Sequence, residues 1–218
     1  MYVIPPHELR AIYQKAGSPP AVGTYTDKSS IVRWLYWSRI RKMLALARVH
    51  GGKQVLDLGC GDGVMLPSLS KQYEKVHGVD LKINCSQMMV EHFGLLNIDL
   101  YRMDFITGSF KGNQYDLIFA ASSLEHFADR DKLFGKVSDL LIPGGHIIFS
   151  SPTENMFYEI GRKMFTYTKP SDHYYSCDEI AQTADKYLDR KNVFYGPLGL
   201  PEVISAYGIF TFQKPLTG

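Results

Sequence analysis

A short apolar run that ends in a dense group of glycines is the feature of this sequence that most constrains its fold. Residues 55–63 read Val-Leu-Asp-Leu-Gly-Cys-Gly-Asp-Gly. The run predicts a buried strand, and the glycines predict a tight turn whose backbone can approach a ligand at the strand's carboxyl end. Gly59 and Gly61 fit the GxGxxG dinucleotide fingerprint, but Val64 stands where its third glycine belongs, which disfavours a diphosphate cofactor.

Short apolar runs alternate with helix-like stretches along most of the chain, which predicts an α/β fold with a mainly parallel sheet. We expect strands at 53–58, 75–80, 98–103, 115–121, 146–151, 191–196 and 206–214. We expect helices at 64–73, 82–93, 129–141 and 176–188, with Asp129 as a cap and Pro143-Gly144-Gly145 as a stop and turn.

The chain's size and balance are those of one globular domain, with 218 residues of which 45% are hydrophobic. Before the glycine turn we expect a short helix near 7–16 and an amphipathic helix over 31–47, capped at Ser29-Ser30 and ended by Gly51-Gly52. We divide the single domain into an N-terminal arm and cap helix (1–50), a core (51–151), a lid insertion (152–175) and a C-terminal part (176–218).

Acidic residues follow the next two predicted strands. Asp80, with Leu81 after it, ends the strand about 20 residues beyond the glycine turn, where a ribose diol would need a two-oxygen acceptor. Asp104 and Phe105 end the third strand and could accept from an exocyclic amine and stack on a purine. Either acid alone would more often be a cap or turn residue, but three such features at consecutive strand ends favour a nucleoside-binding site.

The ordered motifs resemble those of the class I S-adenosylmethionine-dependent methyltransferases. Residues 55–63 are similar to the family's first motif, 115–127 to its fourth-strand motif and 140–150 to its fifth, and the likeness is dense over 52–152. The resemblance implies a Rossmann-like, doubly wound sheet of seven strands in the order 3-2-1-4-5-7-6, whose last strand is antiparallel.

The resemblance also implies which residues bind S-adenosyl-L-methionine, which leaves as S-adenosyl-L-homocysteine. Asp57 and the turn would hold the methionine end, Asp80 and Leu81 the ribose, and Asp104 and Phe105 the adenine. The implied cofactor-binding set is Asp57, Gly59, Cys60, Gly61, Gly63, Asp80, Leu81, Asp104, Phe105, Ala121 and Ser122.

Glu125 and His126 follow the fourth strand, where the resemblance places the methyl group, so they are the candidate catalytic residues; each could instead serve structure alone. Two subfamilies, the small-RNA 2′-O-methyltransferases and the ubiquinone-pathway O-methyltransferases, carry Glu-x-x-Glu-His here as a divalent-metal site. Ser122 stands at the first glutamate, so even with His173 as a third ligand the oxygen donors fall short, and we predict no metal.

The acceptor is less constrained than the donor. Aromatic residues in the arm and the insertion favour a small, partly hydrophobic acceptor, methylated on oxygen before nitrogen or carbon. The net charge of +2 gives no global attraction to nucleic acid, yet residues 29–50 carry five basic residues and no acid, so an RNA or protein acceptor is the first alternative. A non-catalytic cofactor-binding module is the second.

The sequence also bears on where the protein works. Three cysteines without CxxC spacing suggest neither a disulfide framework nor a zinc site. There is no apolar stretch of about 18 residues and no signal-peptide pattern at the N-terminus. We therefore expect a cytoplasmic protein without a transmembrane segment, and its oligomeric state is left open.

Overall fold

The computed structural model describes residues 3–17, 24–110, 112–164 and 174–216 of the chain. Within it the chain forms two compact units, residues 1–111 and 112–218, which are described in turn. The boundary falls inside the predicted core of 51–151, and the arrangement as a single domain stays a prediction. The strands form a seven-stranded sheet in the order β3-β2-β1-β4-β5-β7-β6, which confirms the predicted fold class.

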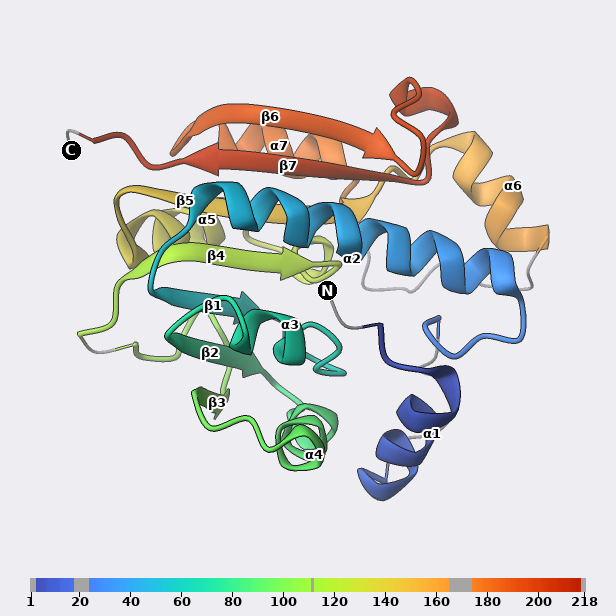
Figure 1. The fold of residues 1–218 in the computed structure, drawn as a ribbon. Coiled ribbons are helices and arrows are strands. Elements are labelled where there is room, and N and C mark those ends of the chain that lie inside the picture. The colour runs from blue at the N-terminus through green and yellow to red at the C-terminus, as the bar shows by residue number, and fades with distance from the viewer. Residues whose placement is uncertain (1–2, 18–23, 111, 165–173, 217–218) are drawn as a thin grey trace. The chain divides into compact units, whose positions relative to one another are not determined.

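The described residues of the first unit form three parallel strands and four helices (Figure 1). Its elements are α1 (Pro6–Lys15), α2 (Ser30–His50), β1 (Gln54–Leu58), α3 (Leu66–Ser70), β2 (Lys75–Asp80), α4 (Asn84–Phe93) and β3 (Ile98–Arg102). The predicted caps of α2 are confirmed: the Ser29 side chain accepts a hydrogen bond from the Val32 amide, and Gly51 ends the helix with φ of 62°. Helix α3 has five residues, fewer than predicted, and Pro67 lies in its first turn, where the missing amide hydrogen breaks no helical bond.

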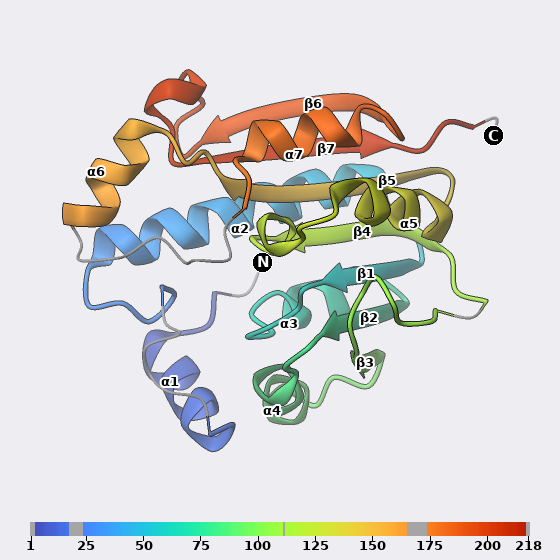
Figure 2. The same cartoon turned by 180° about the vertical axis from the view of Figure 1, so that it is seen from behind.

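The second unit carries the other four strands. Its elements are β4 (Tyr115–Ala121), η2 (Leu124–His126), α5 (Arg130–Leu140), β5 (Leu141–Pro152), α6 (Met156–Met164), α7 (Cys177–Ala184), β6 (Asp189–Gly196), η3 (Glu202–Ile204) and β7 (Tyr207–Gln213). β4 and β5 are parallel, while β7 runs antiparallel to both β5 and β6, as predicted for the last strand. Figure 2 shows α5 and α7 together on one face of these strands.

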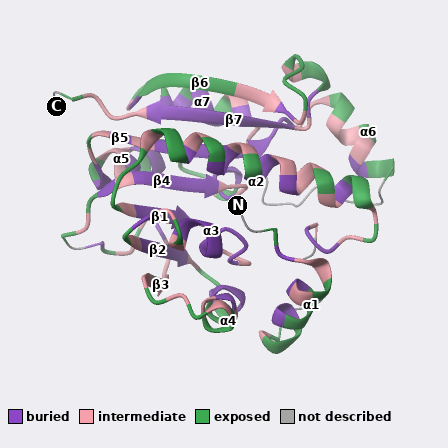
Figure 3. Ribbon diagram, viewed as in Figure 1, coloured by how far each residue is buried: buried purple, intermediate pink, exposed green. Residues whose placement is uncertain are grey.

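Aromatic residues fill the core of the second unit. Phe149 of β5 stacks on Phe210 and Phe212 of β7, with ring centroids 5.3 and 5.9 Å apart, and all three side chains are fully buried. Figure 3 shows how burial differs among the strands of this unit: β4, β5 and β7 are mostly buried, whereas β6 is largely exposed. β6 is the last strand in the sheet order, and its charged residues at 189–191 suit an edge that pairs with no further strand among the described residues.

The predicted turn at 143–145 lies inside a strand, where the pairing of β5 with β4 shifts register between Leu141 and His146. Residues 143–145 do not separate α5 from a strand that starts at 146, because β5 already begins at Leu141. The first residues of β5 are hydrogen-bonded to Lys214, which directly follows β7. The Gly144 amide donates to the Lys214 carbonyl, and the Lys214 amide donates to the Gly145 carbonyl. The Lys214 ammonium also reaches the carbonyls of Ser138 and Leu141, which satisfies acceptors at the end of α5. The helix predicted to 188 likewise ends earlier, at Ala184.

Candidate active site

The glycine turn after β1 is tied to the carboxyl end of β2. The amides of Gly59 and Cys60 both donate to the Val79 carbonyl, at 2.9 and 3.1 Å, and the Gly63 amide donates to the Cys60 carbonyl at 2.7 Å. Gly59, Gly61 and Gly63 all have positive φ, at 76°, 37° and 72°. The chain can follow this path at low cost only because these residues are glycines.

Asp80 closes the turn from one side. Its Oδ2 accepts from the Gly61 amide at 3.0 Å and its Oδ1 from the Lys82 amide at 2.9 Å. A Cβ on Gly61 would lie 3.7 Å from Asp80 Oδ2, so the predicted ribose acid and the turn are brought together. The neighbouring Leu81 is 62% exposed.

Helix α4 closes the turn from the other side. The Ser86 hydroxyl donates to the Gly61 carbonyl at 2.6 Å and lies 3.5 Å from Cys60 Sγ. A Cβ on Gly63 would lie only 2.9 Å from Ser86 Cα, so this glycine is required by the approach of α4. The Cys60 side chain is buried between the turn and Gly78, and burial raises the pKa of its thiol.

Two further carboxyl groups flank the turn. Asp57 is 2% exposed, and burial, then the charge of Asp80, raises its pKa to about 7. Burial likewise raises the pKa of Asp62 to about 6, although the Tyr13 hydroxyl donates to Asp62 Oδ2 at 3.2 Å. Neither Asp62 nor Tyr13 was predicted as a site residue. Asp62 could have been found because it lies inside the motif, but nothing in the sequence links it to Tyr13, 49 residues away.

The predicted adenine-binding pair is engaged within the first unit. Asp104 Oδ1 accepts from the Thr107 amide at 2.8 Å and from the Thr107 hydroxyl at 3.0 Å, which is the turn role that an isolated aspartate often has. Phe105 is 3% exposed and packs against Phe110, with ring centroids 5.7 Å apart. Their contacts with adenine stay a prediction.

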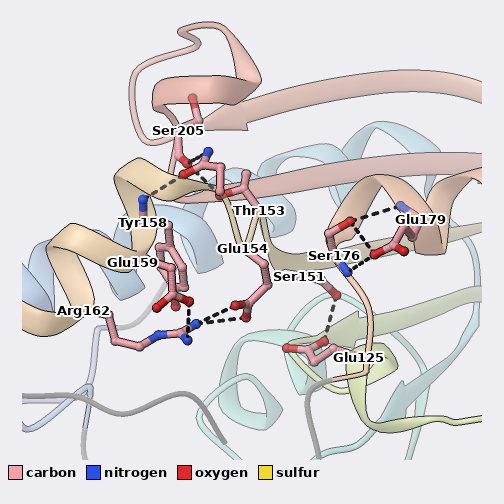
Figure 4. A network of polar contacts seen from close by, with 11 residues as sticks. Glu125, Ser151, Thr153, Glu154, Tyr158, Glu159, Arg162, Ser176, Glu179 and Ser205 are labelled. Carbon is pink, nitrogen blue, oxygen red and sulfur yellow. Dashed lines mark hydrogen bonds and ion pairs between the residues drawn. The ribbon is translucent and has the colours of Figure 1, made fainter.

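The candidate catalytic residues lie at the carboxyl end of β4 in the second unit. Ser122 follows Ala121 and adopts φ of 53°, which is unusual for a residue with a side chain, while its amide donates to the Ser150 carbonyl at 2.8 Å. Glu125 is fully buried, and its Oε2 accepts from the Ser151 hydroxyl at 2.8 Å (Figure 4). Glu125 Oε1 is also buried and has no hydrogen-bond partner among the described residues, whereas His126 is exposed.

The third ligand that a metal site would need lies outside the described residues. His173 lies outside the described residues, as do Phe165 and Tyr167 of the predicted lid. Within the described ranges, no group of three His, Cys, Asp or Glu side chains could hold a metal ion. The absence of a metal stays a prediction.

The predicted lid contains a buried ion pair that no sequence motif indicates. Glu154, at φ of 54°, accepts two hydrogen bonds from Arg162 at 2.9 and 3.0 Å, and Arg162 also donates to Glu159 at 2.8 Å (Figure 4). The guanidinium lies 4.6 Å from the centre of the Tyr158 ring. Arg162 is the one buried residue of α6, while the helix's large apolar residues are exposed: Met156, Phe157, Ile160 and Met164.

Comparison with known proteins identifies what this arrangement is similar to. The family pattern of the methyltransferase domain matches residues 33–187. A ubiquinone biosynthesis O-methyltransferase of Acinetobacter baylyi is 27% identical over 165 residues, 67% of this chain and 69% of that protein. Aklanonic acid methyltransferase DauC of a Streptomyces species is 32% identical over 118 residues, and the match covers 51% of this chain and 54% of that protein.

A solved structure supports the fold over nearly the whole chain. The N-methyltransferase NodS from Bradyrhizobium japonicum, in complex with S-adenosyl-L-homocysteine, superposes with a TM-score of 0.69. The match covers 95% of this chain and 98% of NodS at 15% identity. At that identity the likeness concerns the fold alone.

Proposed function

Because this chain belongs to the methyltransferase domain family and is an S-adenosylmethionine-dependent methyltransferase, we propose that it methylates a small, partly hydrophobic acceptor, on oxygen before nitrogen or carbon. The observation that carries the proposal is the glycine turn, fixed between Asp80 and α4, in a chain whose relatives are named for small-molecule acceptors.

The turn fits the cofactor. The three glycines at positive φ carry no side chains, so among residues 59–63 only Cys60 and Asp62 contribute side chains to the turn. Asp80 offers two carboxylate oxygens beside Gly61, as a ribose diol requires. In our proposal these residues, with Asp57 toward the methionine ammonium group and Asp104 and Phe105 toward the adenine, bind S-adenosylmethionine. Ala121 and Ser122 remain proposed contacts as well.

When bound, the cofactor supplies an electrophilic methyl group on a positively charged sulfur. The chain's own task is then to align the acceptor atom with that group, and to remove a proton where the acceptor arrives protonated. His126 is exposed and is the proposed base. Glu125 is a less suitable base because it is fully buried, so it stays the second candidate catalytic residue, and its Oε1 has no hydrogen-bond partner within the part of the chain that the structure describes.

The residues proposed to surround the acceptor are aromatic, but only some of them are exposed. Phe157 and Tyr174 are 57% and 53% exposed, as residues that meet a ligand would be. Tyr175, in contrast, donates to the Ala128 carbonyl at 3.0 Å and its ring packs under Arg130. In the arm, Trp37 is buried.

The basic helix gives less support to a macromolecular acceptor than its sequence alone did. Arg39 is buried and donates to the Tyr25 hydroxyl at 3.3 Å, and Arg33 donates to the carbonyls of Asp27 and Lys28. Two of the five basic residues are thus engaged inside the first unit. Among the described residues no helix is long and apolar enough to cross a membrane. We keep the prediction of a cytoplasmic location, and the three cysteines are buried and form no disulfide within the described part of the chain, as a reducing compartment favours.

A radiolabelled methyl donor tests the acceptor class. The protein is incubated with labelled S-adenosylmethionine and panels of phenols, carboxylic acids, amines, transfer RNA and protein extract, and the labelled product is identified. We expect label in a small hydroxylated aromatic compound, and a strong loss of turnover in His126→Ala. The exposed Asp139→Asn in α5 serves as the matched control.

Each other outcome would replace part of the proposal. Label in RNA, with an affinity that falls steeply with salt, would establish a macromolecular acceptor. Cofactor binding without transfer to any panel or to cell extract would indicate a non-catalytic module. Full turnover in His126→Ala would remove the proposed base.

A further inference from the structure

Two neighbouring segments of the second unit carry large apolar side chains on their outer side. One is α6, with the four exposed apolar residues named above, and the other is the loop between β6 and β7 that contains η3. The two segments are in contact, and Figures 1 and 2 show them together from opposite sides. The loop adds Leu198, Leu200, Val203 and Ile204, and the residues of both segments are between 41% and 80% exposed. We call the exposed apolar residues of 156–164 and 198–204 the apolar surface. Such a gathering is typical of an interaction site, because apolar residues on an ordinary surface are scattered.

Hydrogen bonds at both ends of α6 hold its apolar side outward. At the start, Asn155 Oδ1 accepts from the Tyr158 amide at 2.7 Å, and Asn155 Nδ2 donates to the Glu202 carbonyl of η3 at 2.6 Å. In the last turn, the Arg162 guanidinium is bound twice by Glu154, as Figure 4 shows. Turning the helix over would bury its apolar residues but would break both attachments. The outward position of the apolar residues is therefore built into the fold.

The polar groups of the loop are largely satisfied within the second unit. Asn155 Nδ2 also reaches the Ser205 carbonyl at 3.0 Å, and the Ser205 hydroxyl lies 3.1 Å from the carbonyls of both Leu200 and Pro201. The Ile204 amide donates to the Pro201 carbonyl at 3.1 Å. A protein partner makes about one hydrogen bond for every 100–200 Å² of interface, and this surface has few polar groups to offer it. The hydrocarbon of a lipid bilayer asks for none and accepts only polar groups that are already paired.

The charge beside the apolar surface has the sign that anionic lipid attracts. Lys163 is the one charged residue of 156–164 and 198–204 that is exposed. Of the acids in these segments, Glu159 accepts a hydrogen bond from Arg162, and Glu202 is half-buried. A lysine near the headgroups of an anionic bilayer strengthens binding, whereas an exposed acid would oppose it.

We propose that the apolar surface docks the protein on a lipid bilayer that contains anionic phospholipid. Helix α6 lies in the interfacial layer, with its apolar side toward the acyl chains and Lys163 at the level of the headgroups. The binding is reversible, because the inserted area is that of a few side chains. The proposal goes beyond the proposed function and does not depend on the identity of the methyl acceptor.

Sedimentation with vesicles tests the docking. The full chain is mixed with vesicles of phosphatidylcholine that contain a quarter of phosphatidylglycerol, and the bound fraction gives a partition coefficient. We expect the parent protein to bind. The double variant Phe157→Gln, Ile160→Gln should bind roughly tenfold or more weakly, because two apolar side chains no longer enter the acyl region.

The matched control is the double variant Val49→Gln, Leu96→Gln. It replaces two apolar residues of the first unit that are more exposed than Phe157 and Ile160, and it should bind like the parent protein. Lys163→Gln should bind several-fold more weakly than the parent on the vesicles with phosphatidylglycerol, and equally on phosphatidylcholine alone.

A fluorescent label on α6 gives a second measurement that does not rely on weakened binding. The three native cysteines are buried, so Ile160→Cys offers an exposed thiol for an environment-sensitive dye. We expect the emission to rise and shift to shorter wavelength with vesicles, and brominated acyl chains to quench it.

Several results would overturn the proposal and leave the methyltransferase assignment untouched. They are a parent protein that does not sediment with vesicles, a Phe157→Gln, Ile160→Gln variant that binds as tightly as the parent, and a label that vesicles leave unchanged. Sedimentation velocity without lipid covers the remaining occupant: a dimer that the same double variant dissociates would show that a second copy covers the apolar surface.

Discussion

Gly63 gives the sharpest test of how the cofactor turn is built. An alanine there would place its Cβ 2.9 Å from Ser86 Cα and 3.2 Å from Met89 Cβ, both part of α4, at a φ of 72°. The left-handed conformation costs a residue with a side chain about 1 kcal/mol or more. Forcing a methyl group against backbone adds about 1–3 kcal/mol, because the helix has to shift. We expect Gly63→Ala to lower the free energy of unfolding by about 2–4 kcal/mol.

Gly94 is a matched control for the conformational part of that cost. It ends α4 with φ of 58°, and a Cβ there would meet nothing within 4 Å. Gly94→Ala should therefore lose only about 1 kcal/mol. Urea denaturation of both variants, with the slope checked for two-state behaviour, gives the difference. Equal losses in the two variants would refute the argument that α4 presses on Gly63, and so would an undiminished stability of Gly63→Ala.

Three further perturbations test the buried charges and hydrogen bonds. Ser151→Ala removes the donor to Glu125 Oε2, so urea denaturation should show a loss of about 1–3 kcal/mol, and a loss no larger than that of an exposed serine would contradict the hydrogen bond. Arg162→Met leaves Glu154 buried without its partner and should lower the free energy of unfolding by about 3 kcal/mol or more. Adding Glu154→Gln should restore part of that stability. A double variant no more stable than the single one would argue against the ion pair. The pKa of Asp57 is raised in the folded state, to about 7, so the folded protein binds more protons than the unfolded chain between about pH 4 and 7 and loses stability as pH rises through that range. Asp57→Asn should abolish this loss and exceed the parent protein's stability at pH 8 by up to roughly 4 kcal/mol without cofactor, and parallel pH profiles would refute the shift.

The strand positions could be predicted because buried parallel strands are written locally, as apolar runs bounded by turn residues. β1, β2 and β4 lie within a residue of the predicted limits. β5 begins five residues before its prediction, because its first part is held by Lys214, some 70 residues further along the chain. A proline and two glycines indicate a turn only while such a distant partner is unknown.

In the candidate site, too, the residues of the local motif could be predicted, whereas the contacts from distant segments could not. The glycines and Asp80 could be predicted because their roles follow from backbone conformation and strand order, which the motif contains. Tyr13 and Ser86 could not, because each acts on the turn through a single side-chain contact from a helix whose own periodicity indicates only burial. The pKa of Asp62 belongs with them, because burial and the charge of Asp80 set it, and neither can be read from the residue itself.

Helix α6 shows where pattern analysis gives the wrong direction. Its apolar residues fall on one side of the helix and its charged residues on the other, a pattern that ordinarily predicts an apolar face against the protein. The structure reverses it: Arg162 is buried, while Met156 and Ile160 are 80% and 54% exposed. The reversal follows from Glu154, whose carboxylate lies beside the start of the helix and binds the guanidinium twice. A bidentate ion pair supported by Glu159 compensates the burial of charge, so the polar side can face inward. Amphipathicity therefore predicts that α6 has an apolar and a polar face, but the position of the buried Glu154 decides which of the two faces the protein covers.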